Sequence, residues 1–105
     1  MKLSICTDVM GNLPFIEMLD KCVKLGVEGI EMTGGGWSSA PHFHTDERLA
    51  DKGLLKSKLK EIAVRGLEIA ALNCSGNPLD PGALGEKHHR EIEQTIRLAG
   101  EIGVT

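Results

Sequence analysis

Neutral hydrogen-bonding side chains gather in one short stretch of the sequence, where Asn73, Ser75 and Asn77 follow an apolar run and precede Pro78. Amides and hydroxyls are the groups that a polyol binder needs, because they both donate and accept hydrogen bonds. Asn and Ser also cap turns. The stretch therefore predicts either a sugar-binding loop or a fixed turn, and both interpretations stay open at this point.

A second candidate is Glu31, near the end of the apolar run 27–32. Its carboxylate could accept a substrate hydroxyl or act as a catalytic acid or base. A charge inside a short β run needs some partner, so a neighbouring Arg or Lys could satisfy it instead. Contact with a substrate and pairing with a basic side chain are therefore both open interpretations of Glu31.

Three glycines and Trp37 follow Thr33, two residues after Glu31. Backbone N–H groups at residues 34–36 could cradle an anion such as a sugar phosphate, and a mobile lid loop is the other interpretation. The indole of Trp37 could stack on the C–H face of a sugar ring or plug one end of the core.

Four histidines are possible ligands or proton carriers. His42 and His44 flank Phe43, so in an extended segment both imidazoles would project to the same side and could contact a metal or a substrate. A solvent-exposed loop pair is the alternative. His88 and His89 are adjacent on an expected helix and diverge by ~100°, so we expect surface positions for both.

These residues depend on a strand-and-helix unit that recurs along the chain. Strands are predicted at 3–7, 27–32 and 67–72, with the start of a fourth at 104–105. Apolar spacing predicts helices after Pro14, around 55–63 and around 92–102, the last carrying Ile92, Ile96, Ala99 and Ile102. Gly26, Gly66 and Gly103 each supply a left-handed helix stop just before a strand.

Alternating strands and helices predict an α/β fold with parallel pairing and right-handed crossovers. Periodicity does not separate an open doubly wound sheet from a barrel. The connections from strand to helix are long and polar, whereas those from helix to strand are minimal. Because parallel folds place ligands at the carboxyl ends of strands, we expect function in residues 7–14, 31–53 and 73–86.

Bulk composition limits the possible partners. The 105 residues fit one domain, 1–105, and the net charge of -3 is interleaved rather than gathered into a basic stripe, which argues against nucleic acid. There is no signal peptide pattern and no membrane-spanning apolar run, so we expect a cytoplasmic protein without a membrane partner. Three scattered cysteines indicate free thiols, with Cys22 in the core.

Three motifs together resemble the sugar phosphate isomerase/epimerase family of xylose-isomerase-like barrels. They are LGVEGIE at 25–31, LNCSGNPL at 72–79, and TIRLA at 95–99 leading to Gly103 and Val104. The likeness covers essentially the whole chain. A closed (β/α)8 TIM barrel takes roughly 250 residues, so the resemblance implies the N-terminal part of such a barrel, truncated at the start of strand 4.

The resemblance also implies a chemistry. Members of the family bind Mn, Mg, Co or Zn through carboxylates and a histidine in the second half of the barrel, and glutamates move a proton between adjacent carbons. No metal ligand is therefore assigned here, and we expect this chain alone to bind no metal and to be inactive. Its expected contribution is a wall facing a small sugar or sugar phosphate, made of Glu31, Trp37, His42, His44, Asn73, Ser75 and Asn77.

Two rival functions remain. One is a small open α/β module that binds a phosphorylated or polyol ligand without catalysis. The other is a barrel that cuts DNA at abasic sites, against which the lack of a basic face argues. Strands without barrel partners would leave unpaired edges, so the sequence also predicts self-association of the chain.

Overall fold

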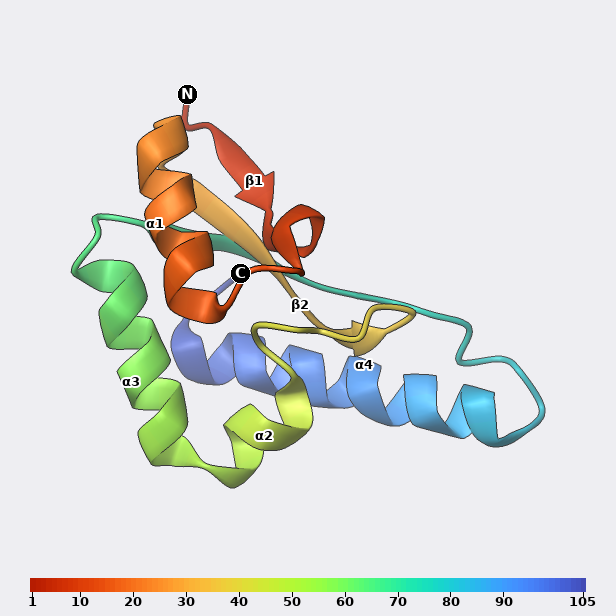
Figure 1. The fold of residues 1–105 in the computed structure, drawn as a ribbon. Helices are drawn as coiled ribbons and strands as arrows, with labels where there is room; N and C mark the ends of the chain where they lie inside the picture. The colour runs from red at the N-terminus through yellow and green to blue at the C-terminus, as the bar shows by residue number, and fades with distance from the viewer.

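Three strands form one parallel sheet in the order β1-β2-β3 (Figure 1). They are β1 (Ser4–Cys6), β2 (Gly29–Gly36) and β3 (Glu68–Ser75). This is a computed structural model, and it describes residues 1–105 apart from the side chains of residues 47–49. The parallel pairing confirms the α/β prediction, although β2 and β3 each run several residues beyond the predicted apolar stretch.

A helix follows each strand, and each of these helices leads into a glycine. The helices are α1 (Phe15–Leu25), α3 (Lys52–Ala63) and α4 (Ala83–Ile102). Gly26, Gly66 and Gly103 have φ angles of 77°, 71° and 77°. This left-handed conformation costs other residues roughly 1–2 kcal/mol. The predicted helix stops are therefore confirmed at all three positions.

Two short elements lie in the long connections from strand to helix. The 3-10 helix η1 (Thr7–Met10) follows β1, and α2 (Thr45–Ala50) lies between β2 and α3. Neither element was predicted from the sequence. Both lie in connections at the carboxyl ends of the strands, where ligands bind in parallel α/β folds.

The core lies between the sheet and the helices. Ile30 and Met32 of β2 are fully buried and pack in one cluster with side chains from all three long helices. The helix residues in that cluster are Met18, Leu19 and Cys22 of α1, Leu55 and Ile62 of α3, and Leu98 of α4. Helices α1, α3 and α4 therefore cover the same face of the sheet.

The buried stripe of α4 differs from the prediction. Ile96 is 69% exposed, and the buried positions include His88, Glu91, Thr95 and Leu98. Ile102 does pack against the core, so ranking positions by apolar character alone identified only part of the buried face. The polar side chains on the buried face are satisfied by specific partners, described below, whereas Ile96 and Ala99 line a groove beside β3.

The predicted fourth strand is absent from residues 104–105 of the described chain. The Val104 N–H instead donates to the Ala99 carbonyl at 2.9 Å, which completes the C-terminal cap of α4. The Leu67 N–H makes the corresponding bond to the Ile62 carbonyl at 3.2 Å, one residue before β3 begins.

Two further predictions concern thiols and membranes. Cys6, Cys22 and Cys74 are all free, and Cys22 is fully buried in the core, as expected. Among the described helices none is both long and apolar enough to cross a lipid bilayer. The cytoplasmic location stays a prediction.

Candidate functional site

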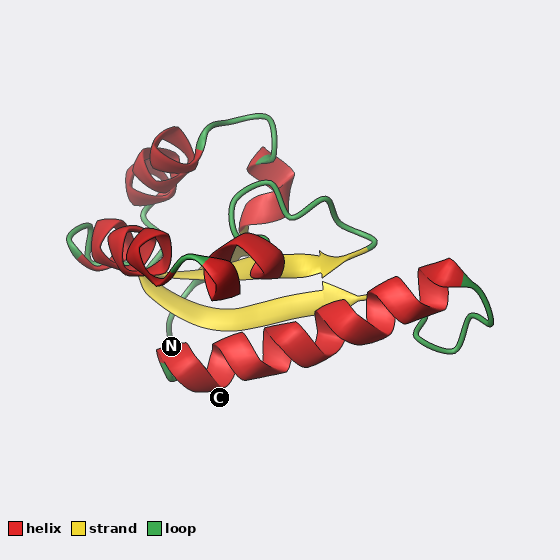
Figure 2. Ribbon diagram, turned by 90° about the horizontal axis from the view of Figure 1, so that it is seen from below, coloured by secondary structure: helices red, strands yellow, loops and turns green.

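The sheet has a second face, opposite the helices. Side chains alternate along a strand, so Glu31 and Thr33 point away from the side of Ile30 and Met32. Their partners in the neighbouring strands lie on the same side. We call this the open face, and it carries Cys6, Glu31, Thr33, Asn73 and Ser75. Figure 2 shows α4 beginning near the end where the strands finish and running back along the sheet toward their starts.

Glu31 is half-buried on the open face. It pairs in register with Cys6 of β1 and Ala71 of β3. No described Arg or Lys approaches its carboxylate, and its side chain makes no hydrogen bond to any described residue, so internal pairing does not explain it. The carboxylate is an acceptor available to a ligand.

Asn73 lies beside Thr33 in the register of the sheet. The Ser75 hydroxyl donates to Asn73 Oδ1 at 3.0 Å, which leaves the Asn73 amide N–H groups free to donate elsewhere. Glu31, Asn73 and Ser75 thus share one face, as the sequence predicted. Thr33 was missed, although its spacing of two from Glu31 was a usable signal.

Asn77 behaves as a turn residue. Its side-chain Oδ1 accepts from the Leu79 N–H at 3.3 Å, and its backbone N–H donates to His88 Nδ1 at 2.8 Å. These bonds favour the turn-capping interpretation over substrate contact. The loop after β3 is thereby held against α4.

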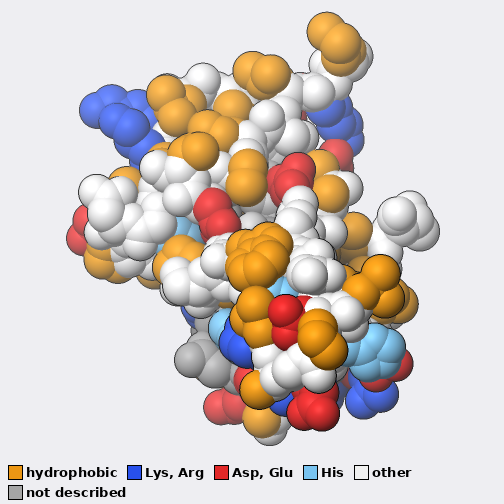
Figure 3. Space-filling model, turned by 90° about the vertical axis from the view of Figure 1, so that its right-hand side faces the viewer, with side chains coloured by type: hydrophobic (Ala, Val, Ile, Leu, Met, Phe, Trp, Pro, Cys, Tyr) orange, Lys and Arg blue, Asp and Glu red, His pale blue; other side chains and the backbone are white. Residues whose placement is uncertain are grey.

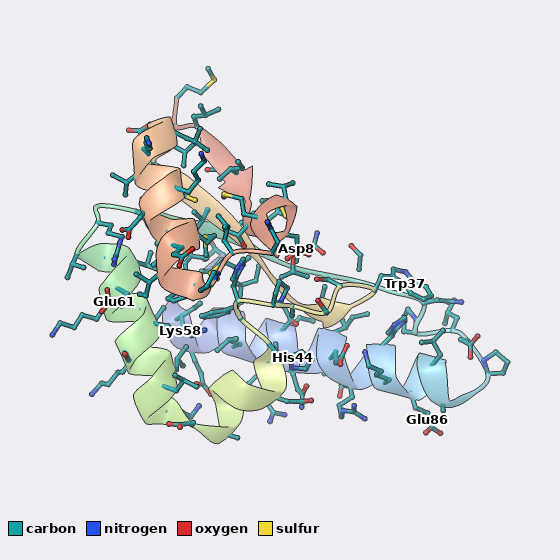
Figure 4. The ribbon with its side chains drawn as sticks, in the orientation of Figure 1. Asp8, Trp37, His44, Lys58, Glu61 and Glu86 are labelled. Atoms are coloured by element: carbon teal, nitrogen blue, oxygen red, sulfur yellow. The ribbon has the colours of Figure 1, made fainter. Side chains whose placement is uncertain are left out.

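His88 is 1% exposed, so the predicted surface position is wrong. It lies under the loop after β3, where a Cβ on Gly76 would come within 2.7 Å of the ring. Trp37, which is labelled in Figure 4, meets the same ring edge to face, with centroids 4.4 Å apart. The Trp37 residue stays 63% exposed. His89 is exposed, as predicted, beside Glu93 at 3.3 Å.

His42 and His44 do not form the expected pair. Residues 41–43 form a turn rather than an extended segment. His42 is buried with Nε2 2.8 Å from the Leu13 carbonyl, whereas His44 Nε2 lies 3.6 Å from Glu91 Oε1. The two imidazoles therefore contact different elements, and in this geometry they cannot bind one metal ion together.

The three glycines are the end of β2 and are buried, so they are neither a lid nor an open anion loop. The Gly36 N–H does bind an anion, the carboxylate of Glu91, at 2.6 Å. A Cβ on Gly35 would lie 2.6 Å from Glu91 Oε2. The glycines therefore allow α4 to approach the strand closely.

Glu91 is 1% exposed and its Oε2 also accepts from Lys87 Nζ at 3.0 Å. Burial alone would raise the pKa of this carboxyl, but the Gly36 N–H and the Lys87 ammonium outweigh it and hold the pKa below the ordinary value. Glu91 is therefore a buried anion. The Lys87 partner is four residues away on the same helix and was a usable local signal, whereas the Gly36 N–H lies 55 residues away along the chain.

Asp8 and Ser38 connect two strand ends. The Ser38 hydroxyl donates to Asp8 Oδ2 at 2.6 Å and accepts from the Ala40 N–H at 2.9 Å. Asp8 follows β1 and is labelled in Figure 4.

The face seen in Figure 3 mixes apolar, acidic and histidine side chains without a continuous area of Lys and Arg.

The fold and the site define an α/β chain with a parallel sheet and a polar open face. No protein family model matches the sequence. The chain is similar to a Bacillus subtilis (strain 168) protein described as "Uncharacterized protein YfiH", with 49% identity over 104 residues. The match covers 99% of this chain and 33% of that protein, so the chain spans about a third of the length of the curated relative it matches.

Proposed function

We propose that this chain is the N-terminal part of a metal-dependent sugar or sugar phosphate isomerase/epimerase with a (β/α)8 barrel. Its contribution is the substrate-facing wall on the open face. The observation that carries the proposal is Glu31, a half-buried carboxylate without a described side-chain partner, on the same face of the sheet as the amide of Asn73. A sugar hydroxyl would supply the missing donor.

The arrangement of helices favours a barrel over a doubly wound sheet. A doubly wound sheet carries helices on both faces, whereas α1, α3 and α4 share one face here. An apolar groove also runs beside β3, lined among others by Ala70, Leu72, Ile96 and Val104. A fourth parallel strand would fit there.

The size of the relative is compatible with this proposal. A chain that makes up 33% of a relative leaves about two thirds of that protein for further strands and helices. A closed barrel needs roughly 250 residues, and a protein about three times as long as this chain can hold one.

In the proposed reaction Glu31 either accepts a hydrogen bond from a substrate hydroxyl or takes the proton from a substrate carbon and returns it to the adjacent carbon. The amide of Asn73, oriented by Ser75, donates to a neighbouring oxygen of the substrate. The divalent metal of the resembled family would polarise a carbonyl and hydroxyl pair, and its ligands belong to later strands. The substrate-facing wall would thereby determine which face of the sugar points toward the metal.

The test uses the full-length protein that carries this chain, supplied with Mn²⁺ and a panel of aldoses, ketoses and their phosphates in D₂O. Proton NMR measures exchange of the carbon-bound hydrogen. We expect exchange with at least one sugar and a loss of on the order of 100-fold or more in Glu31→Gln. Glu28→Gln, an exposed carboxylate in the segment before β2, is the matched control. Full activity in Glu31→Gln would overturn the assigned role.

Binding without catalysis is the second candidate. The open face supports this candidate because it carries a single carboxylate, Glu31. Its other side chains are those of Cys6, Thr33, Asn73 and Ser75. A binder needs neutral donors and acceptors more than an acid and base pair. In that case the panel would show saturable binding of a sugar but no exchange of carbon-bound hydrogen.

A further inference from the structure

His44 lies between two carboxylates that come from different elements. Its Nε2 is 3.6 Å from Glu91 Oε1 of α4, and its Nδ1 is 3.9 Å from Asp46 Oδ2 of α2. One ligand atom from each of the three residues lies within 4.8 Å of the others. Figure 4 shows His44 where the chain enters α2, beside α4.

The two oxygens of Glu91 have different surroundings. Oε2 accepts from the Gly36 N–H and from Lys87 Nζ, at 2.6 and 3.0 Å. Among the described residues, the nearest partner of Oε1 is His44 Nε2, at a distance longer than a good hydrogen bond. One oxygen of a buried anion therefore faces the cluster without a donor at bonding distance.

The cluster is open to solvent on its other side. The side chain of Asp46 is 50% exposed and that of His44 is 25% exposed, whereas that of Glu91 is 1% exposed. A cation can therefore reach the site, and Asp46 can change rotamer to close on it. The buried Glu91 supplies the fixed part of the site.

We propose that His44, Asp46 and Glu91 bind a divalent transition-metal ion of the Zn²⁺ type. One imidazole nitrogen and two carboxylates are a ligand set that zinc accepts, and the imidazole disfavours Mg²⁺ and Ca²⁺, which prefer oxygen. Zinc bonds to nitrogen and oxygen are near 2.0–2.2 Å, so the three ligand atoms must move closer together than their present separations of up to 4.8 Å. Rotamer changes of His44 and Asp46 can supply this movement. Three protein ligands leave one position for water.

The ion would connect the segment after β2 to α4. This site is distinct from the metal that the family resemblance implies, because that metal takes its ligands from later strands. It also does not depend on the proposed sugar chemistry. Its rival is a metal-free arrangement in which His44 Nδ1 accepts from the Asp46 backbone N–H at 3.3 Å and His44 Nε2 directs its N–H toward Glu91 Oε1.

The test titrates Zn²⁺ by calorimetry into the untagged, EDTA-treated protein, with Co²⁺ as a visible-absorption probe of the ligands. We expect one tight ion per chain, thermal stabilisation by that ion, and affinity losses on the order of tenfold or more in His44→Gln and Asp46→Asn. Both changes lie at accessible side chains, so folding should survive them. Glu91→Gln is avoided because that residue is buried.

Matched controls are His89→Gln and Glu93→Gln, another histidine and carboxylate pair, which lies exposed on α4. Both should bind the ion as the native protein does. Lys87→Gln removes a positive charge beside Glu91 and should tighten binding. Absence of stoichiometric Zn²⁺ binding by the native protein, or equal affinity in His44→Gln and Asp46→Asn, would overturn the site.

Discussion

Gly36 and Glu91 are 55 residues apart, yet the backbone N–H of Gly36 donates to the Glu91 carboxylate at 2.6 Å. The bond joins α4 to the last residue of β2. Gly36 has a φ of +79°, and a Cβ there would lie 2.2 Å from the Ser75 carbonyl oxygen. Three elements, β2, β3 and α4, therefore meet at one glycine, next to the residues proposed to bind ligands.

Replacing this glycine should be costly. Gly36→Ala combines a left-handed backbone with a collision against the backbone of β3, so we expect a loss of about 2–5 kcal/mol in the free energy of unfolding. Gly26→Ala is the control, because Gly26 has a φ of +77° and nothing within 4 Å of the added Cβ. It should lose about 1–2 kcal/mol. Equal losses in urea titrations would contradict the close contact.

Local features of the fold were predictable from the sequence, and tertiary ones were not. The stops at Gly26 and Gly66 follow from backbone preferences that act within a few residues. The buried position of Glu91 depends on a strand end far away in sequence, and that of His88 depends on a loop folding over it. The open face was predictable because alternation along β2 is itself local.

The charge on Glu91 should make the fold sensitive to acid. A carboxyl group whose pKa is lower in the folded protein than in the unfolded chain stabilises the fold when the pH is above the unfolded-state pKa. That stabilisation is lost as the pH falls through the folded-state pKa. The pKa of Glu91 is lowered from 4.5. We therefore expect stability to decline below about pH 4.5, and less steeply in Glu91→Gln.

At neutral pH, with EDTA present, Glu91→Gln should lose about 1–3 kcal/mol, because its amide keeps an acceptor for Gly36 but no longer attracts Lys87. Guanidinium titrations at several pH values measure both effects. Glu93→Gln, two residues away and exposed, should leave the acid profile nearly unchanged. An identical acid profile for the native protein and Glu91→Gln would show that the Glu91 charge is not stabilising.

The contact between Trp37 and His88 provides an optical readout of the loops at the strand ends. Trp37 is the single tryptophan of the chain, and its ring centroid lies 4.4 Å from that of His88. His88→Leu removes both this ring and the acceptor for the Asn77 N–H, so we expect altered Trp37 emission and a loss of about 1–3 kcal/mol. His89→Leu, on the exposed side of α4, should change neither emission nor stability appreciably. A native spectrum in His88→Leu would contradict the contact.

The isolated 105-residue chain should self-associate. The outer edges of β1 and β3 lack a described partner strand, and the groove beside β3 is lined by Ala70, Leu72 and Ile96. Unpaired edges with apolar flanks pair readily with other chains, and a lysine on the edge prevents this. In light scattering coupled to size exclusion, we expect dimers or larger species for the native chain and a shift toward monomer for Ala70→Lys. Ser57→Lys, which adds the same charge on the exposed side of α3, should keep the native distribution. A stable native monomer across the micromolar range would count against an incomplete barrel, because its edges would then need no partner.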